Sequence, residues 1–348
     1  MHGALKQELD FVIVGAQKSG TTSLFEYMRR HPELCVPNAK EAPYFSTDAE
    51  YRRMSWEAYL QATFPAADPR RRWGTITPQY MIGGLSFAQE GSEQQRGDPR
   101  TVPARIHERC PGARLIAILR DPVERARSHH AMARYKLAQR GEQDERSFAE
   151  VIIDLLEPEA LAAARACPRT STGYITWGEY GRILTGYYEV FPADQILVLY
   201  TSELKSEPAA VMRRMFSFLG VDEAYLPDNL GTVYRPTRVE RHIPWLNLDR
   251  VRADLAAHGS ARAAWSLLPE GAQTGIEHSF GRLNRWVDVH NRRHPPDEFP
   301  HLPAAETTDA PVDDVPELRA HFDADGRVLA ELLGGVAPPW LGSAVAAA

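Results

Sequence analysis

The segment Phe11-Val-Ile-Val-Gly-Ala-Gln-Lys-Ser-Gly-Thr-Thr-Ser23 decides the fold of this chain. Its first four residues, Phe11–Val14, form a short apolar run, which is typical of a buried parallel strand. After the loop Gly15–Gly20, apolar residues recur at helical spacing from Leu24 to Met28, and Pro32 ends that helix. The chain therefore opens with a strand, a glycine-bounded loop and a helix.

Strands and helices continue to alternate along the chain, and Arg114–Leu119 is the clearest further strand. Other strands are expected at Gly74–Thr77 and Gln195–Tyr200, a surface loop at 88–101, and helices at 56–64, 121–140, 147–166, 179–190, 207–219 and 317–333. Such alternation implies right-handed crossovers and a sheet covered on both faces. The expected fold class is α/β: a P-loop-like three-layer fold with a central, mostly parallel sheet flanked by helices.

Composition excludes several classes of protein. The 348 residues are 43% hydrophobic and 25% charged, as is usual for a globular protein, and they are expected to form a single domain, 1–348. The formal net charge of −6 argues against a nucleic-acid partner. Anionic ligands stay compatible with it, because local charge matters more than the total.

The chain shows no pattern of targeting or of membrane insertion. No run of roughly 18 apolar residues occurs, so no membrane span is expected, and Met1–Asp10 does not read as a leader. The three cysteines, Cys35, Cys110 and Cys167, have neither disulfide nor zinc-ligand spacing. We expect a cytoplasmic location, and nothing in the sequence indicates an oligomeric state.

The loop before the first helix has the chemistry of an anion site. Helix N-termini present unpaired N–H groups and the positive end of the helix dipole. Gly20 lets a ligand approach the backbone, Lys18 supplies a cation, and Ser19, Thr21, Thr22 and Ser23 supply hydroxyl groups. A purely structural strand–turn–helix link is the alternative interpretation of this segment.

A nucleotide kinase is the rival functional interpretation. A Walker A loop carries lysine directly after its second glycine, whereas Thr21 stands there and the lysine lies inside the loop at Lys18. The strand that could carry a magnesium-binding acid ends in Arg120 instead. Transfer of a sulfonyl group, which carries less negative charge than a phosphoryl group, could proceed with a positioned lysine and no metal.

A second anchor for an anion follows the strand 114–119. Arg120 has a planar fork of donors suited to phosphate, and Ser128 lies about two turns into the helix that follows. Strand and helix could thus hold one phosphate between them. Taken alone, Arg120-Asp-Pro122 could equally be a capped turn, because Asp and Pro are favoured at helix starts.

Together these segments resemble the sulfotransferases that use 3′-phosphoadenosine-5′-phosphosulfate, and the bacterial and carbohydrate (heparan-type) branch more than the aryl and steroid branch. The first loop resembles the family's 5′-phosphosulfate loop, and Arg120 with Ser128 resembles its 3′-phosphate signature. The resemblance implies that 3′-phosphoadenosine-5′-phosphosulfate is the co-substrate and that no metal is needed. It covers most of 8–222 and returns at 314–341.

The segment Lys40-Glu41-Ala-Pro-Tyr44-Phe45 resembles the pattern in which the carbohydrate branch carries its general base. The resemblance makes Glu41 the catalytic base, working in a partly apolar pocket, and Lys18 the second catalytic residue. A solvated Lys–Glu pair is the alternative, and His129 and His130 are alternative bases. Where the branch often has a catalytic lysine, in Glu-Lys-[Ser/Thr]-Pro, this chain has Ile76.

Later residues resemble the family more loosely. Tyr234 and Arg235 could supply a late loop over the 3′-phosphate, and 223–313 is expected to be an insertion that sets acceptor specificity. The predicted function is sulfonyl transfer to a hydroxyl or amine of a small-molecule or glycan acceptor. A P-loop-type nucleotide kinase and a catalytically inactive nucleotide-binding module are the alternatives.

Overall fold

The computed structural model describes residues 6–38, 40–46, 48–64, 68–82, 98–139, 144–167, 169–232, 234 and 315–342. Nearly all of them belong to one compact unit formed by Met1–Lys136, Gln143–Arg235 and Asp313–Ala348. A second unit, Leu137–Glu142 and Pro236–Val312, contains almost none of the described residues. Of the predicted acceptor-specificity insertion, 223–313, the structure therefore describes only residues 223–232 and 234.

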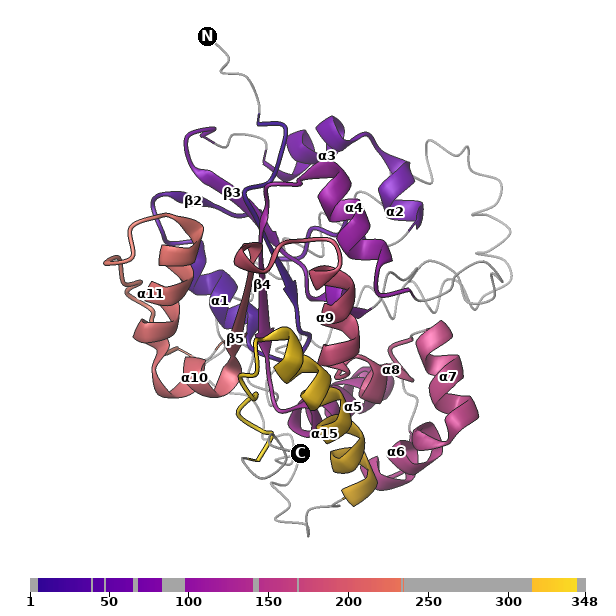
Figure 1. Ribbon diagram of the computed structural model, residues 1–348. Helices are drawn as coiled ribbons and strands as arrows, with labels where there is room; N and C mark the ends of the chain where they lie inside the picture. Colours follow the sequence, from indigo (N-terminus) through magenta and orange to yellow (C-terminus); the bar gives the residue numbers. More distant parts are fainter. Residues whose placement is uncertain are drawn as a thin grey trace, which may run out of the picture. The chain divides into compact units, whose positions relative to one another are not determined.

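A five-stranded parallel sheet forms the centre of this unit (Figure 1). The strand order is β2-β3-β1-β4-β5. The strands are β1 (Phe11–Gly15), β2 (Leu34–Cys35), β3 (Arg72–Ile76), β4 (Arg114–Leu119) and β5 (Ile196–Tyr200). The four strands expected from the sequence, β1, β3, β4 and β5, are confirmed within about two residues at each end, and so is the parallel arrangement.

Helices connect the strands and pack on both sides of the sheet. In chain order they are α1 (Thr21–Met28), α2 (Asp48–Arg53), α3 (Trp56–Thr63), η1 (Pro78–Ile82), α4 (Thr101–Arg109), α5 (Pro122–Gln139), α6 (Phe148–Leu156), α7 (Pro158–Ala166), α8 (Gly173–Thr176), α9 (Tyr180–Tyr188), η2 (Ala193–Gln195), α10 (Thr201–Ser206), α11 (Pro208–Leu219) and α15 (Pro316–Leu332). Of the helices that the structure describes, none is long and apolar enough to cross a membrane.

Alternate residues of β1 enter two different cores, which makes the fold three-layered. Val12 and Val14 pack with side chains of α3, α4 and α9, whereas Phe11 and Ile13 pack with those of α1 and α11. All four residues are at most 1% exposed. A strand buried on both faces needs apolar residues at every position, which explains the unbroken run that predicted it. The α/β three-layer prediction is confirmed.

The prediction of one helix at 147–166 is wrong, because the structure has two helices there, α6 and α7. Ser147 begins α6 with a capping box, in which its hydroxyl accepts the Glu150 N–H and the Glu150 carboxylate accepts the Ser147 N–H. The backbone leaves the helical conformation at Glu157 and becomes extended, and Pro158 is the first residue of α7. Proline has no N–H and disfavours helix in the residue before it, so the apolar pattern continues while the backbone breaks.

Candidate active site

The carboxyl ends of β1, β3 and β4 meet at one edge of the sheet. The Ala16 N–H donates to the Ile118 carbonyl at 2.8 Å, which ties the start of the loop to β4. The Thr77 N–H donates to the Ile13 carbonyl at 3.0 Å, which ties the end of β3 to β1. Ligands of open parallel sheets bind outside this edge, where the loops diverge.

The loop after β1 delivers backbone amides to this edge. Gly20 is the N-cap of α1 with φ 95°, and no side chain caps the helix. A residue with a Cβ would be strained in that left-handed conformation, so the predicted need for glycine is explained. Lys18 also has a positive φ, 67°. The first-turn N–H groups of α1 are thus placed as the anion site requires.

Arg120 lies against the loop. Its Nη1 is 3.5 Å from the Lys18 carbonyl oxygen, and its Nε donates to the Glu124 carboxylate at 3.0 Å. The Glu124 side chain is 56% exposed, so this ion pair is weak and a phosphate could replace it. The structure therefore brings together Lys18 and Arg120, which are 102 positions apart in the chain.

Ser128 lies on α5 and is buried, 7% exposed. The start of this helix is capped as the sequence predicts, because Asp121 Oδ1 accepts the N–H groups of Val123 (2.9 Å) and Glu124 (3.1 Å). The Asp121 carboxylate also pairs with Arg319 of α15, at 2.9 Å. Asp121 therefore fixes the start of the helix that carries Ser128 in two ways, by capping its first turn and by pairing with α15.

The two histidines weighed as alternative bases lie in the core. The ring of His129 stacks on Trp177 with centroids 4.7 Å apart, and His130 packs edge-to-face on Phe148. Burial, and next the nearby Arg125, lowers the pKa of His129 well below its usual value; burial also lowers the pKa of His130. Buried imidazoles without solvent access are poorly placed to take a proton from an acceptor.

Glu41 lies in a polar setting rather than the partly apolar pocket that was expected. Its side chain is 41% exposed, and its carboxylate accepts from Gln79 Nε2 at 2.6 Å and lies 3.1 Å from Lys40 Nζ. Tyr44 and Phe45, which follow Glu41 in the chain, are 2% and 0% exposed. Their rings lie in the hydrophobic core and do not line a pocket around the Glu41 carboxylate. Gln79 lies in η1, the short helix after β3, and brings Glu41 to the same edge of the sheet as Lys18.

Two further predicted donor-site residues contact each other. The Tyr234 N–H donates to the Ser23 hydroxyl oxygen at 3.2 Å, and the Tyr27 hydroxyl donates to the Thr232 carbonyl at 2.7 Å. The start of the predicted late loop therefore packs on α1. Arg235 lies outside the described residues.

Thr201 is a residue of the site that the sequence did not reveal. Its hydroxyl oxygen lies 2.7 Å from the Ser19 carbonyl and 3.0 Å from the Leu119 carbonyl. From the start of α10, directly after β5, it therefore joins the loop to the end of β4. Finding it would have required the strand order, which no local pattern supplies.

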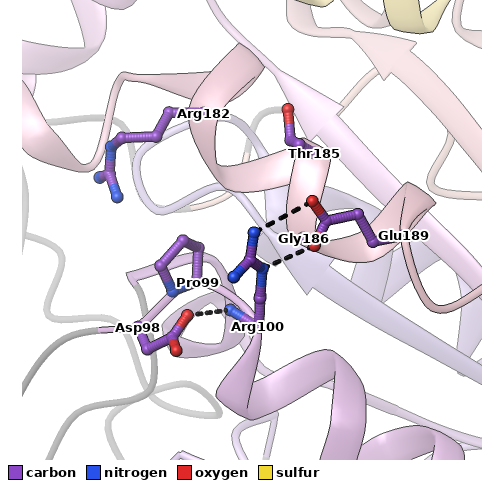
Figure 2. Close-up of a pocket in the computed structure, with 7 residues that line it drawn as sticks. All are labelled: Asp98, Pro99, Arg100, Arg182, Thr185, Gly186 and Glu189. Carbon is purple, nitrogen blue, oxygen red and sulfur yellow. Dashed lines mark hydrogen bonds and ion pairs between the residues drawn. The ribbon is translucent and has the colours of Figure 1, made fainter.

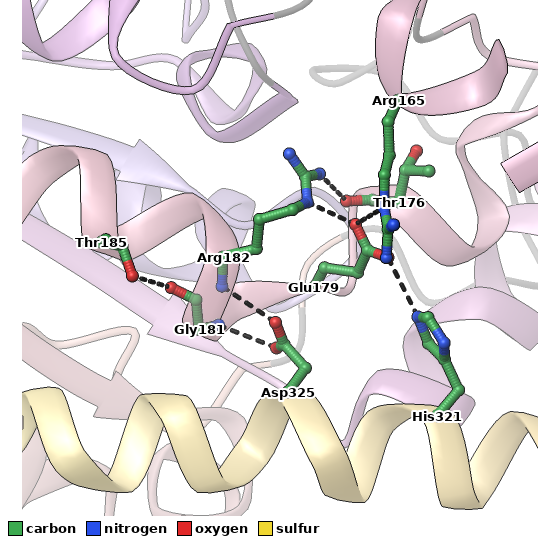
Figure 3. A network of polar contacts seen from close by, with 8 residues as sticks. All are labelled: Arg165, Thr176, Glu179, Gly181, Arg182, Thr185, His321 and Asp325. Atoms are coloured by element: carbon green, nitrogen blue, oxygen red, sulfur yellow. Dashed lines mark hydrogen bonds and ion pairs between the residues drawn. The ribbon is translucent and has the colours of Figure 1, made fainter. Parts of the chain in front are cut away.

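A polar network around the buried Glu179 holds the N-terminus of α9 (Figure 3). Glu179, 1% exposed, contacts Arg165 (2.6 Å), Arg182 and His321 of α15 (3.0 Å). Burial acts to raise the pKa of Glu179, but the His321 and arginine contacts outweigh it and lower the pKa to about 2.

Asp325 of α15 caps α9 from outside the helix. Its carboxylate accepts the N–H groups of Gly181 (2.8 Å) and Arg182 (2.9 Å), as Figure 3 shows. Burial raises the pKa of Asp325 to about 6, against the effect of these hydrogen bonds. The first-turn amides of α9 are thus satisfied by a distant carboxylate, and the two helices approach closely at Gly181.

A cavity of about 360 Å³ lies elsewhere, between the residues before α4 and helix α9 (Figure 2). It is lined by Asp98, Pro99, Arg100, Arg182, Thr185, Gly186 and Glu189, and contains none of the predicted site residues. Two hydrogen bonds join the Arg100 guanidinium to the Glu189 carboxylate on its wall, at 2.6 and 3.2 Å.

Among the residues that the structure describes, no group of three or more His, Cys, Asp or Glu side chains could hold a metal ion.

Comparison with protein families matches residues 8–238 to the family described as "Sulfotransferase domain". Over 220 residues the chain is 27% identical to mouse (Mus musculus) heparan sulfate glucosamine 3-O-sulfotransferase 3B1, covering 62% of this chain and 47% of the relative. It is 25% identical over 221 residues to the Drosophila melanogaster bifunctional heparan sulfate N-deacetylase/N-sulfotransferase, covering 61% and 19%. The chain thus matches about half or less of the length of these relatives.

Among solved structures, it is similar to a sulfotransferase from Alicyclobacillus acidocaldarius, with a TM-score of 0.49 and 24% identity over 74% of this chain and 93% of that one.

Proposed function

Since the chain belongs to the sulfotransferase family, we propose that it transfers a sulfonyl group from 3′-phosphoadenosine-5′-phosphosulfate to a hydroxyl or amine of an acceptor. The observation that carries the proposal is the contact between the Lys18 carbonyl and the Arg120 guanidinium. It joins a cationic loop at a helix N-terminus to a second cation, so two phosphates of one nucleotide can be held at one edge of the sheet.

In this proposal the donor is held from two sides. The amides of the loop and of the first turn of α1 hold the 5′-phosphosulfate, and Lys18 faces the oxygen that leaves. Arg120 exchanges its ion pair with the exposed Glu124 for the 3′-phosphate, and Ser128 of α5 adds a hydroxyl.

The reaction is a direct in-line displacement at sulfur. Glu41 takes the proton of the acceptor hydroxyl or amine, whose oxygen or nitrogen forms a bond to sulfur while the bond from sulfur to the phosphate oxygen breaks. The Lys18 ammonium balances the charge that develops on that phosphate oxygen. The products are the sulfated acceptor and adenosine 3′,5′-bisphosphate. A partly exposed Glu41 suits this role, because the acceptor has to reach it from solvent.

For the acceptor we propose a glycan that contains an amino sugar. The support is the heparan sulfate sulfotransferase activity in the names of the relatives. Ile76, which occupies the position of the branch's additional lysine, is fully buried between β-strand and helix side chains. This chain would therefore act without a cation at that position. A cytoplasmic location stays a prediction.

Binding of two nucleotides tests the donor site. The wild-type protein should bind adenosine 3′,5′-bisphosphate about 100-fold more tightly than adenosine 5′-phosphate in isothermal titration calorimetry, and Arg120→Ala should remove most of that preference. Arg213→Ala, which removes an exposed arginine of α11, is the control and should keep the preference. Equal affinities of the wild-type protein for the two nucleotides would contradict the proposed 3′-phosphate site.

Turnover separates the two catalytic roles. With a heparan-backbone oligosaccharide as acceptor, Lys18→Ala and Glu41→Gln should each lower kcat by at least about 100-fold. Glu41→Gln should leave the affinity for adenosine 3′,5′-bisphosphate unchanged, and Glu159→Gln, at an exposed position of α7, should leave turnover unchanged. Near-normal turnover of Glu41→Gln would refute the assignment of the base.

A further inference from the structure

Helix α9 carries two buried tyrosines that reach the two halves of the proposed site. Tyr180 and Tyr187 are seven positions apart, so they lie on one face of the helix, about 10 Å from each other along its axis. Each is 1% exposed, and burial raises the pKa of both phenols above the usual value. Both hydroxyl groups therefore stay protonated and act as hydrogen-bond donors.

Tyr180 contacts the donor half. Its hydroxyl donates to the carbonyl oxygen of Arg120 at 3.0 Å. This bond fixes the backbone at the point where β4 ends and from which the Arg120 side chain leaves toward the Lys18 carbonyl. A shift of this peptide would move the guanidinium away from the loop.

Tyr187 supports the segment that carries Glu41. Its hydroxyl donates to the Tyr80 carbonyl at 2.8 Å, in η1. The hydroxyl of Tyr80, itself 1% exposed, accepts the Tyr44 N–H at 3.0 Å and lies 3.3 Å from the Ala42 carbonyl. The residues directly after Glu41 are therefore held, through one intermediate tyrosine, by α9.

The helix between these two contacts is itself fixed at its start. Asp325 accepts its first two free N–H groups, and Glu179, next to Tyr180, is bound by three basic side chains. These contacts fix the first turn of α9, so the helix can act as a rigid element between its two tyrosines.

We propose that α9 sets the separation between the bound donor and Glu41, with Tyr180 as the positioning residue of Arg120 and Tyr187 as the positioning residue of the Glu41 loop. The inference rests on the proposed function and adds to it two residues that contact neither substrate. The Tyr180 hydroxyl is assigned to the affinity for the donor, and the Tyr187 hydroxyl to turnover. The rate of in-line transfer is sensitive to the distance between the base and the bound donor.

Tyrosine-to-phenylalanine variants test this division, because each removes one oxygen atom and keeps the ring. Tyr180→Phe should weaken the binding of adenosine 3′,5′-bisphosphate about fivefold to tenfold and leave hydrogen–deuterium exchange in residues 40–46 unchanged. Tyr187→Phe should leave that affinity within twofold, accelerate exchange in 40–46 about tenfold, and lower kcat without raising the KM for the donor.

Tyr188→Phe is the matched control. It removes a phenol oxygen from the same helix, one that forms no hydrogen bond with any residue in the described part of the chain, and should change none of these quantities. The inference is overturned if Tyr180→Phe and Tyr187→Phe affect affinity and exchange alike, or if both behave as the control does. If the wild-type protein fails to bind adenosine 3′,5′-bisphosphate, the proposed function fails, and the exchange in 40–46 still decides whether α9 holds the Glu41 loop.

Discussion

Replacing Asp325 by asparagine should change how the stability of the protein depends on pH. In the folded protein Asp325 has a pKa of about 6 because it is buried, against an ordinary value of 3.8. A raised carboxyl pKa means that the folded state binds the proton more tightly than the unfolded state does. Asp325 therefore favours folding most at low pH, and this contribution is lost as the pH rises toward and through 6.

The two pKa values give the size of the effect. A folded-state pKa of about 6 against 3.8 corresponds to about 3 kcal/mol between pH below 3.8 and pH well above 6. About 1.4 kcal/mol of it falls between pH 5.0 and 7.5, where the fold can be studied conveniently. Urea unfolding of wild type and Asp325→Asn at these two pH values measures it, as a change in the difference between their unfolding free energies.

The expected result is that the wild-type protein loses stability relative to Asp325→Asn as the pH rises from 5.0 to 7.5. The sign does not depend on how well the asparagine accepts the Gly181 and Arg182 amides, since that contribution is the same at both pH values. Asp323→Asn is the control, because it makes the same change of net charge on the same helix. It shows how much of the pH-dependent change in unfolding free energy arises from net charge alone. A difference between wild type and Asp325→Asn that stays constant over this range would refute the reasoning.

Three other substitutions have expected outcomes in urea unfolding. Gly181→Ala should cost about 2 kcal/mol or more, because its Cβ would lie 2.3 Å from the Asp325 carbonyl oxygen and force α9 and α15 apart; unchanged stability would contradict that packing. Glu179→Gln should cost about 2 kcal/mol at pH 7, because it removes the charge-assisted hydrogen bonds of a buried carboxylate with partly exposed Arg165, Arg182 and His321. That cost should shrink as the pH falls below about 4.5, since the folded-state pKa of Glu179 is lowered to about 2 and its contribution is lost on protonation; a cost independent of pH would refute this. Gly220→Ala should cost about 1 kcal/mol, because Gly220 ends α11 at φ 66°, and a stabilising effect would contradict the strain argument.

The sequence was sufficient to predict the fold class and the loop that leads into α1, because both depend on local signals. A strand buried on both faces has to be apolar throughout, and Gly20 is required by its own backbone conformation. Asp121 as the cap of α5 is a local signal of the same kind. The break before Pro158 also had a local signal, but the continuous apolar pattern on both sides hid it.

The rest of the site depends on contacts between distant segments. That Thr201 lies beside Ser19, or that Gln79 contacts Glu41, follows from the strand order and from the paths of loops, which no residue pattern nearby encodes. The burial of His129 depends on which face of α5 packs against Trp177. Sequence reasoning can name residue types suited to a reaction, but it cannot tell which of them the tertiary structure covers.

The cap that α15 places on α9 has a consequence for folding during synthesis on the ribosome. All five strands have been made once the chain reaches Tyr200, but Asp325 follows Arg182 by about 140 positions. At roughly 5–20 residues per second, this gap lasts roughly 7–30 s. During that time the first amides of α9 can be satisfied only by water or by other groups, and Glu179 is without His321. The start of α9 therefore receives its last contacts from a helix that is made after every residue proposed for the site.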